Sequence, residues 1–198
     1  MTHTGETRPG GRTARTREAV RSATIVEIGE HGYDGLTVEG VAARSGVHKT
    51  TVYRRWGSVQ GLVVDALAMA AADPWQVPDT GSIAGDLRGL ARAVLDTFTD
   101  PESGPVATAF VTAATQHPVA AGALRDYLQV RHEQSARIIA RAVERGELPA
   151  DVDAHEVVRA AVAPLYYRLF ITREPVDGQV ADRAADAALV AARAGVLG

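Results

Sequence analysis

Three observations on the sequence predict an all-α protein of about nine helices. First, no clear run of alternating apolar and polar residues marks a β-strand, and β-branched clusters are short. Second, apolar residues recur at helical spacing between breaks rich in Gly, Pro, Ser and Asp. Third, residues 37–56 have the pattern of a helix-turn-helix, two short helices joined by a tight glycine turn. The fold class is therefore a three-helix helix-turn-helix domain followed by a second helical domain.

Composition and charge narrow the class of protein. The 198 residues include no cysteine, which excludes disulfides and thiolate zinc sites. No apolar run reaches the ~18 residues that span a bilayer and no signal-peptide pattern opens the chain, so we expect a cytoplasmic protein with no membrane partner. Residues 1–58 carry nine Lys and Arg against six Asp and Glu, whereas the remaining 140 carry twelve against eighteen. A basic N-terminal part on an acidic body is typical of a DNA-binding module.

The first helix of the motif begins after Thr37, whose hydroxyl can cap it. Val38, Val41 and Ala42 recur at helical spacing and are expected to face inward. Gly46 follows at the point where a helix ends in a left-handed residue, which glycine adopts without steric cost. These positions predict the cap, the inner face and the turn of the motif.

The second helix of the motif is basic on one side. It opens at His48 or Lys49, and Val52 and Trp56 lie four residues apart on one face, so we expect both to be buried. The side chains expected to point away from the core are Lys49, Thr50, Thr51, Tyr53, Arg54 and Arg55. The alternative is two amphipathic helices of an ordinary bundle, with these charges merely solvated. The coincidence of the turn chemistry with a basic second helix favours the motif.

The segment from Arg17 to Leu67 resembles the DNA-binding domain of TetR-family transcriptional regulators. Three pieces carry the resemblance: REAVRSATIVEIGEHGYDGLTVEGVAARSGV, HKTTVYRRW and GSVQGLVVDAL. On this basis we predict a flexible basic arm over residues 1–12, a helix-turn-helix DNA-binding domain over 13–72, and a C-terminal ligand-binding and dimerisation domain over 73–198. The resemblance covers the last of these only at the level of architecture.

Helices are predicted on both sides of the motif and through the rest of the chain. The helix before the motif has an inner stripe of Val20, Ala23, Thr24 and Ile28, and Ser58 can cap the helix after it. The other predicted bounds are about 13–31 for the first helix and about 83–99, 106–116, 120–145, 154–172 and 178–194 for the later ones.

The resemblance implies a homodimer that binds double-stranded DNA at a palindromic operator, and we expect a repressor released by a small-molecule effector. Thr50 and Thr51 can reach base edges or thymine methyls, and the resemblance implies phosphate contacts from Lys49, Tyr53 and Thr37. The full set predicted to contact DNA is Thr37, Lys49, Thr50, Thr51, Tyr53, Arg54, Arg55 and Arg17.

The resemblance also implies a dimer interface and an effector pocket. In that family the last two helices of each subunit form a four-helix bundle between subunits. The predicted interface consists of Val158, Val162, Leu165, Tyr166, Leu169, Ala184, Ala188 and Ala191, with closure of the subunit's own core as the alternative. The predicted pocket consists of Val94, Phe98, Phe110, Thr112, Gln116, His117, Tyr127 and Arg131, with plain core or surface as the alternative.

No catalytic pattern, cofactor or metal site is expected, and an enzyme is rejected. The HEVVR stretch starts like the zinc-protease HExxH, but Arg159 stands at the second ligand position. None of the six histidines has a partner at ligand spacing on one helix face. The runner-up function is a helical scaffold or protein-interaction module that no longer binds DNA. Two departures from the family pattern stand out: Val59 where a lysine is common, and Glu27 where an aliphatic residue is usual.

Overall fold

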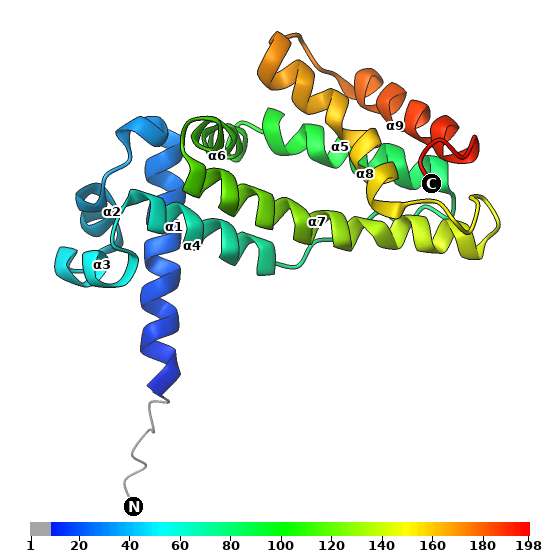
Figure 1. The fold of residues 1–198 in the computed structure, drawn as a ribbon. Coiled ribbons are helices and arrows are strands. Elements are labelled where there is room, and N and C mark those ends of the chain that lie inside the picture. The colour runs from blue at the N-terminus through cyan, green and yellow to red at the C-terminus, as the bar shows by residue number, and fades with distance from the viewer. Residues whose placement is uncertain (1–8) are drawn as a thin grey trace, which may run out of the picture. The chain divides into compact units, whose positions relative to one another are not determined.

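A computed structural model describes residues 9–198, which form helices joined by loops and contain no strand (Figure 1). The elements run in the order α1 (Pro9–Gly35), α2 (Val38–Ser45), α3 (Lys49–Trp56), α4 (Val59–Ala72), α5 (Ile83–Thr99), α6 (Gly104–Gln116), α7 (Pro118–Glu144), α8 (Ala154–Tyr166), the π-helix η1 (Tyr167–Thr172) and α9 (Gly178–Arg193). The predicted all-α fold is therefore confirmed. Within the described residues, no helix is both long and apolar enough to cross a bilayer.

Helix α1 is longer than predicted and is kinked. It begins at Pro9 rather than near residue 13, because proline tolerates the first turn of a helix, where its missing N–H costs nothing. Residues 9–12 of the predicted flexible arm are thus helical, and residues 1–8 lie outside the described residues. Gly32 interrupts α1 with a φ of 69°, a left-handed value that glycine adopts without strain, close to the predicted end of this helix.

The chain divides into two compact units. The first contains residues up to Ala72 together with Pro105–Arg125, and the second contains Asp73–Gly104 and Asp126–Gly198. The predicted domain boundary between residues 72 and 73 coincides with one of these divisions. The predicted domain over 73–198 differs, because α6 packs on α1: a Cβ at Gly29 would lie 3.0 Å from Cγ2 of Val106.

The core of the first unit contains the stripe predicted on α1. Val20, Ala23, Thr24 and Ile28 are all buried, and the Thr24 hydroxyl donates to the carbonyl oxygen of Val20 at 2.8 Å. The largest fully buried residues that α2, α3 and α4 add are Val41, Val52, Leu62 and Val63. This core supports the two helices of the motif from behind.

The second unit is built around α5, the later part of α7, α8 and α9. The largest members of its core are Ile83, Leu87, Leu90, Leu95, Ile138, Ile139, Val157, Val158, Val162, Leu165 and Leu189. Alanines along α9, including Ala181, Ala185 and Ala188, line the side of the helix that faces this core. At the surface, Arg88 pairs with Asp186 at 2.8 Å and Arg92 with Asp182 at 2.5 Å. Exposed pairs of this kind contribute little to stability.

The helix predicted over 154–172 changes its winding near Pro164. Because the backbone N–H of Tyr167 donates to the carbonyl oxygens of both Ala163 and Pro164, the regular ladder is loosened there. Tyr167–Thr172 then form a π-helix, which ends at Arg173 with a φ of 55°. Short π segments occur often at functional sites.

Candidate nucleic-acid interface

The helix-turn-helix forms where the sequence predicts it. Oγ1 of Thr37 accepts a hydrogen bond from the backbone N–H of Gly40 at 3.0 Å and so caps α2. Gly46 follows α2 with φ 67° and ψ 10°, as expected for a left-handed turn residue. His48 is the N-cap of α3, and Gly57 with φ 74° follows its last residue. The predicted cap and turn residues are confirmed.

The side chains of α3 divide into an inner and an outer set. Val52 is fully buried. Trp56 is half-buried rather than buried as predicted, because its indole Nε1–H needs a polar partner and donates to Oδ2 of Asp65 at 2.9 Å. The outer set contains the exposed Lys49, Thr50, Tyr53, Arg54 and Arg55, with Thr51 half-buried.

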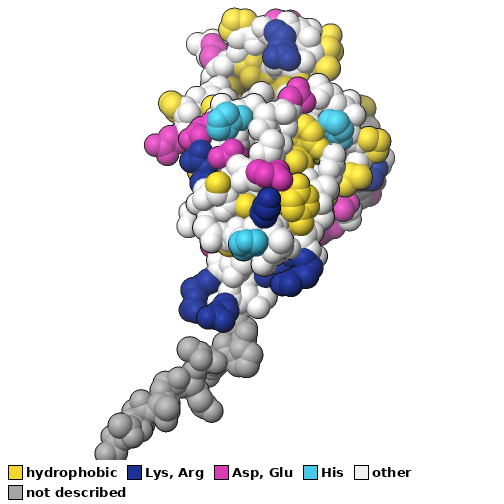
Figure 2. Space-filling model, turned by 90° about the vertical axis from the view of Figure 1, so that its left-hand side faces the viewer, with side chains coloured by type: hydrophobic (Ala, Val, Ile, Leu, Met, Phe, Trp, Pro, Cys, Tyr) yellow, Lys and Arg dark blue, Asp and Glu magenta, His cyan; other side chains and the backbone are white. Residues whose placement is uncertain are grey.

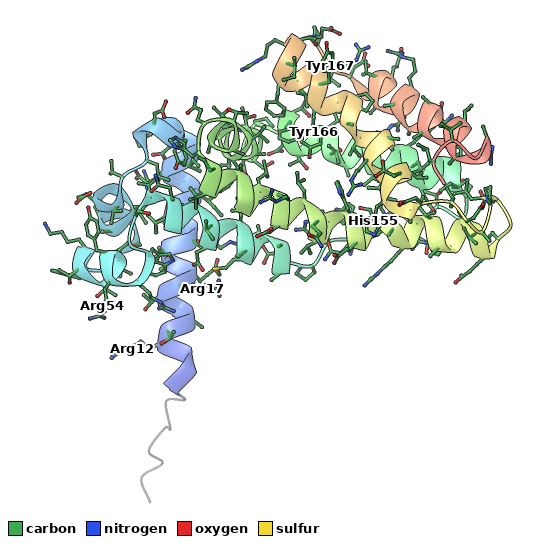
Figure 3. The ribbon with its side chains drawn as sticks, in the orientation of Figure 1. Arg12, Arg17, Arg54, His155, Tyr166 and Tyr167 are labelled. Carbon is green, nitrogen blue, oxygen red and sulfur yellow. The ribbon has the colours of Figure 1, made fainter. Side chains whose placement is uncertain are left out.

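Basic side chains of α1 and α3 share a surface. Figure 2 faces the side that carries α2 and α3, and dark blue Lys and Arg side chains gather near its lower edge. The exposed basic residues of these helices are Arg12, Arg15, Lys49, Arg54 and Arg55. Figure 3 shows Arg12 and Arg54 on the same side of α1. This surface can attract an anionic backbone such as that of DNA.

Asp65 of α4 ties the end of α3 to α1. Nε and Nη2 of Arg17 donate to Oδ1 of Asp65 at 2.9 and 2.6 Å, while Trp56 donates to Oδ2. Burial raises the pKa of Asp65, and the hydrogen bonds from Arg17 and Trp56 lower it. The hydrogen bonds have the larger combined effect, so the pKa of Asp65 lies below its usual value. Arg17 was predicted to contact DNA, and its guanidinium already balances a carboxylate within the unit.

Tyr53 links the two helices of the motif. Its hydroxyl donates to Oε1 of Glu39, in the first turn of α2, at 2.9 Å. This hydrogen bond raises the pKa of Tyr53. The phenol remains half exposed, so the hydroxyl lies at the surface next to a carboxylate that an approaching phosphate would repel.

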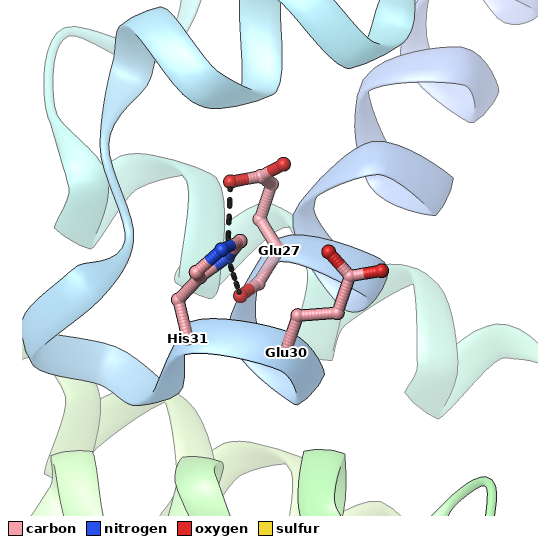
Figure 4. Close-up of side chains that lie close together, drawn as sticks. All are labelled: Glu27, Glu30 and His31. Atoms are coloured by element: carbon pink, nitrogen blue, oxygen red, sulfur yellow. Dashed lines mark hydrogen bonds and ion pairs between the residues drawn. The ribbon is translucent and has the colours of Figure 1, made fainter.

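An ion-pair network between α1 and α2 was not predicted. Glu27 is only 8% exposed, and its Oε1 accepts from Nε of Arg44 at 2.6 Å. Nη2 of Arg44 donates to Oε2 of Glu30 at 2.5 Å, and Nδ1 of His31 lies 3.4 Å from Oε2 of Glu27 (Figure 4). The prediction that no histidine has a possible metal-ligand partner on its own helix is therefore wrong for His31, because the carboxylates of Glu27 and Glu30 lie close to its ring.

The same network accounts for Glu27 at a position where an aliphatic residue is usual. Ligand atoms of Glu27, Glu30 and His31 all lie within 4.8 Å of one another, which is compatible with metal binding. However, the guanidinium of Arg44 already bonds both carboxylates, so we assign a structural ion pair. A Cβ at Gly40 would lie 2.7 Å from Oε2 of Glu27, so the carboxylate occupies the space above a glycine.

The predicted effector-pocket residues are divided between the two units. Phe110, Thr112, Gln116 and His117 belong to the first unit, and Val94, Phe98, Tyr127 and Arg131 belong to the second. In the first unit Phe110 is buried, while Thr112 and Gln116 are exposed. The His117 ring packs on Tyr33 with centroids 4.6 Å apart. In this group Phe110 and His117 pack inside the unit.

In the second unit the predicted pocket residues join an aromatic cluster. The Phe98 ring lies 5.4 Å from Tyr166 and 5.1 Å from Phe170, both edge to face. Arg131 lies 5.2 Å from the centroid of Tyr127 and 5.9 Å from that of Trp75. Burial, with a smaller contribution from Tyr127, raises the pKa of Tyr166 to about 12. Val94 is half-buried beside this core. Phe170 and Trp75 were not among the predicted pocket residues.

The residues predicted at the centre of the dimer interface lie inside the subunit. Val158, Val162, Leu165 and Ala188 belong to the core formed by α5, α7, α8 and α9, and Ala184 is also buried. Their burial, to an exposed fraction of 8% or less, supports the alternative that they close the subunit's own core. They pack α8 and α9 onto each other and onto α5. Of the remaining predicted residues, Tyr166, Leu169 and Ala191 are half-buried.

The outer sides of α8, η1 and α9 carry several exposed apolar residues, and Arg159 and Arg183 are exposed on the same helices. Tyr167 is 57% exposed, Ile171 69% and Val190 68%. Ala163 and Ala187 are exposed on the same elements. Figure 3 shows Tyr166 turned toward α5 and Tyr167 turned away from it. We call these five exposed residues, Ala163, Tyr167, Ile171, Ala187 and Val190, the outer α8–α9 face.

Fold and site together define an all-helical DNA-binding protein of the helix-turn-helix class. Residues 20–66 match the family model described as bacterial regulatory proteins, tetR family, and residues 77–188 match that of the tetracyclin repressor-like C-terminal domain. The chain belongs to the TetR family and is a DNA-binding transcriptional regulator. The family consists of regulators, which supports the expectation that the chain is not an enzyme.

Individual relatives agree with this assignment. The HTH-type transcriptional regulator AqdR of Rhodococcus erythropolis is 34% identical over 156 residues, which cover 79% of this chain and 74% of the relative. The DNA-binding transcriptional repressor TetR of Mycobacteroides abscessus is 30% identical over 189 residues, covering 88% and 94%. The solved structure of the TetR family transcription regulator SCO0332 has a TM-score of 0.71 at 31% identity, covering 89% of this chain and 97% of that one.

Proposed function

We propose that the chain is a homodimeric repressor whose α3 reads base edges in the DNA major groove and whose second unit senses a small molecule. The observation that carries the DNA part is α3 itself. It is a short helix held from behind by the buried Val52, with basic and hydroxyl side chains exposed on its outer side. Such a helix fits the width of the major groove.

The outer side chains of α3 suit two roles. Thr50 and Thr51 stand in its first turn, where short side chains reach base edges. Lys49 and Arg54 carry cationic groups suited to phosphate oxygens, and the Tyr53 hydroxyl can donate to a phosphate once it leaves Glu39. Thr37 at the start of α2 joins them, since backbone N–H groups at a helix N-terminus attract anions. Phosphate contacts position the protein and base contacts give specificity.

A dimer is the second part of the proposal. One helix-turn-helix reads few base pairs, and two of them one helical turn apart, about 34–36 Å, read a palindrome. The outer α8–α9 face supports this assembly, because a dimer would remove its exposed Tyr167, Ile171 and Val190 side chains from water. We expect this face to pack against the same face of a second subunit in a four-helix bundle, as in the family. The proposed interface therefore consists of these exposed residues in place of the buried ones.

Effector sensing is the third part. The aromatic cluster of Phe98, Tyr166 and Phe170 includes a residue of the π-helix, a kind of segment that occurs often at functional sites. An effector that binds only the conformation with the wrong spacing of the two α3 helices shifts the population away from DNA. Moving a two-state equilibrium from 1:99 to 99:1 requires about a 10⁴-fold difference in affinity between the states.

The test is fluorescence anisotropy with DNA from upstream of the chain's own gene against a scrambled duplex. We expect specific binding by the wild type and at least a tenfold loss in Lys49→Glu. The matched control is Arg137→Glu, which makes the same charge change at an exposed position of α7 in the second unit and should bind as the wild type does. Equal, unspecific binding by all three proteins would favour the scaffold alternative.

A further inference from the structure

The N-cap of the recognition helix α3 is an imidazole bonded to a residue that faces outward. Nδ1 of His48 lies 2.8 Å from Oγ1 of Thr50 and accepts from the backbone N–H of Thr50 at 3.4 Å. Both side chains are exposed. Ser, Thr, Asp and Asn are the usual N-caps because their oxygens accept from the first turn. Here a ring nitrogen does so, and it also contacts a hydroxyl.

The backbone contact of His48 indicates the direction of its side-chain contact with Thr50. A backbone N–H can only donate, so its contact with Nδ1 at 3.4 Å favours the tautomer whose ring proton is on Nε2 and whose Nδ1 lone pair points toward Thr50. In that tautomer the Thr50 hydroxyl donates to Nδ1 across the contact of 2.8 Å. That contact uses the single hydroxyl hydrogen of Thr50 and leaves only lone pairs directed outward.

We propose that His48 is a specificity-determining residue, which fixes Thr50 as a hydrogen-bond acceptor toward the base edge. This inference rests on the proposed entry of α3 into the major groove. A threonine hydroxyl can ordinarily either donate or accept, so alone it discriminates poorly between bases. With its hydrogen held by His48, Thr50 pairs with an amino group, which adenine presents at N6 and cytosine at N4. Guanine and thymine present acceptors at the contacted atoms and are rejected.

The neighbouring Thr51 offers an internal comparison. It is half-buried one residue further along α3, and its hydroxyl has no side-chain hydrogen bond to another described residue. Its hydroxyl can therefore rotate to donate or accept. The structure thus gives the two threonines different readout chemistry, although the residue type is the same.

The experiment measures binding of the full chain to an operator set in which each position is replaced in turn by all four bases. Thr50→Val, which removes the hydroxyl at nearly constant shape, identifies the position read by Thr50. At that position we expect the wild type to prefer adenine or cytosine by about threefold to tenfold. His48→Asp keeps an acceptor at the cap and should keep this preference. His48→Ala frees the hydroxyl and should reduce the preference to less than about twofold, with preferences elsewhere unchanged.

The outcomes separate this inference from the proposed function. Specific binding with an unaltered base preference in His48→Ala, or a wild-type preference for guanine or thymine at the Thr50 position, overturns the role of His48 alone. Loss of the preference in His48→Asp overturns it as well. Absence of any sequence-specific binding by the wild type overturns the proposed function and the inference together.

Discussion

Two valine-to-aspartate substitutions separate the subunit core from the proposed dimer face. Val162 of α8 is 6% exposed in the subunit, whereas Val190 of α9 is 68% exposed. In Val162→Asp a carboxylate is buried among apolar side chains with no partner, which costs on the order of several kcal/mol. A domain of this kind is stable by about 5–15 kcal/mol, so much of its stability is lost. In Val190→Asp the carboxylate of an isolated subunit stays in water, where surface substitutions change stability by about 0.5 kcal/mol or less.

Val190→Asp acts on assembly instead. In a two-fold dimer both copies of the residue approach the same seam, so two carboxylates are desolvated close together. We expect this variant to sediment as a folded monomer at micromolar concentration, with wild-type helix content by circular dichroism, and to lose operator affinity. Val162→Asp should melt at a much lower temperature or fail to fold. A Val190→Asp chain that remains a dimer and binds its operator normally refutes the placement of the seam on the outer α8–α9 face.

Three further outcomes follow from the first unit. Because the pKa of Asp65 is lowered on folding, its ionised form stabilises the fold above the unfolded pKa and this contribution is lost as pH falls through the folded pKa. Urea titrations of wild type and Asp65→Asn should therefore differ at pH 6 and converge as the pH drops below about 4. Arg44→Met leaves the buried Glu27 without its guanidinium and should lower the thermal midpoint more than Glu27→Leu, with the double variant near Glu27→Leu. Equal losses in the two single variants would contradict the assignment of a buried pair. Tyr53→Phe should weaken binding about threefold to tenfold on every operator variant alike. A change confined to one base position would show that Tyr53 reads a base.

Local chemistry made the helix-turn-helix predictable. The cap at Thr37, the turn at Gly46 and the inner stripe of α1 depend on residues close in the chain, and periodicity or turn preference identifies them. The helix predicted over about 83–99 agrees with α5, which the structure caps at Ser82, whose Oγ accepts from the backbone N–H of Gly85. These features required no knowledge of which helices meet.

What the sequence left open depends on long-range pairing. Periodicity showed that α8 and α9 are apolar but not which side meets α5, so it could not place Val162 in the subunit core, where the structure has it. The bond between Glu27 and Arg44 joins residues 17 apart, and a pattern within one helix does not reveal it. The sequence did contain a signal for this ion pair: Glu27 stands where an aliphatic residue is usual, and Gly40 on the next helix leaves space for its carboxylate. The π-helix depends on Pro164 and on packing around it, which helical spacing alone does not encode.

The composition of α3 has a practical consequence for chemistry in solution. Lys49 is the only lysine of the 198 residues, and it is the first, exposed residue of the recognition helix. An amine-reactive dye at near-neutral pH therefore attaches at one side chain of the DNA-facing surface, apart from any terminal amine. Bound operator should shield that side chain from the reagent, so the rate of labelling becomes a footprint of occupancy. Acylation there also removes one positive charge, so the labelled chain should bind its operator more weakly.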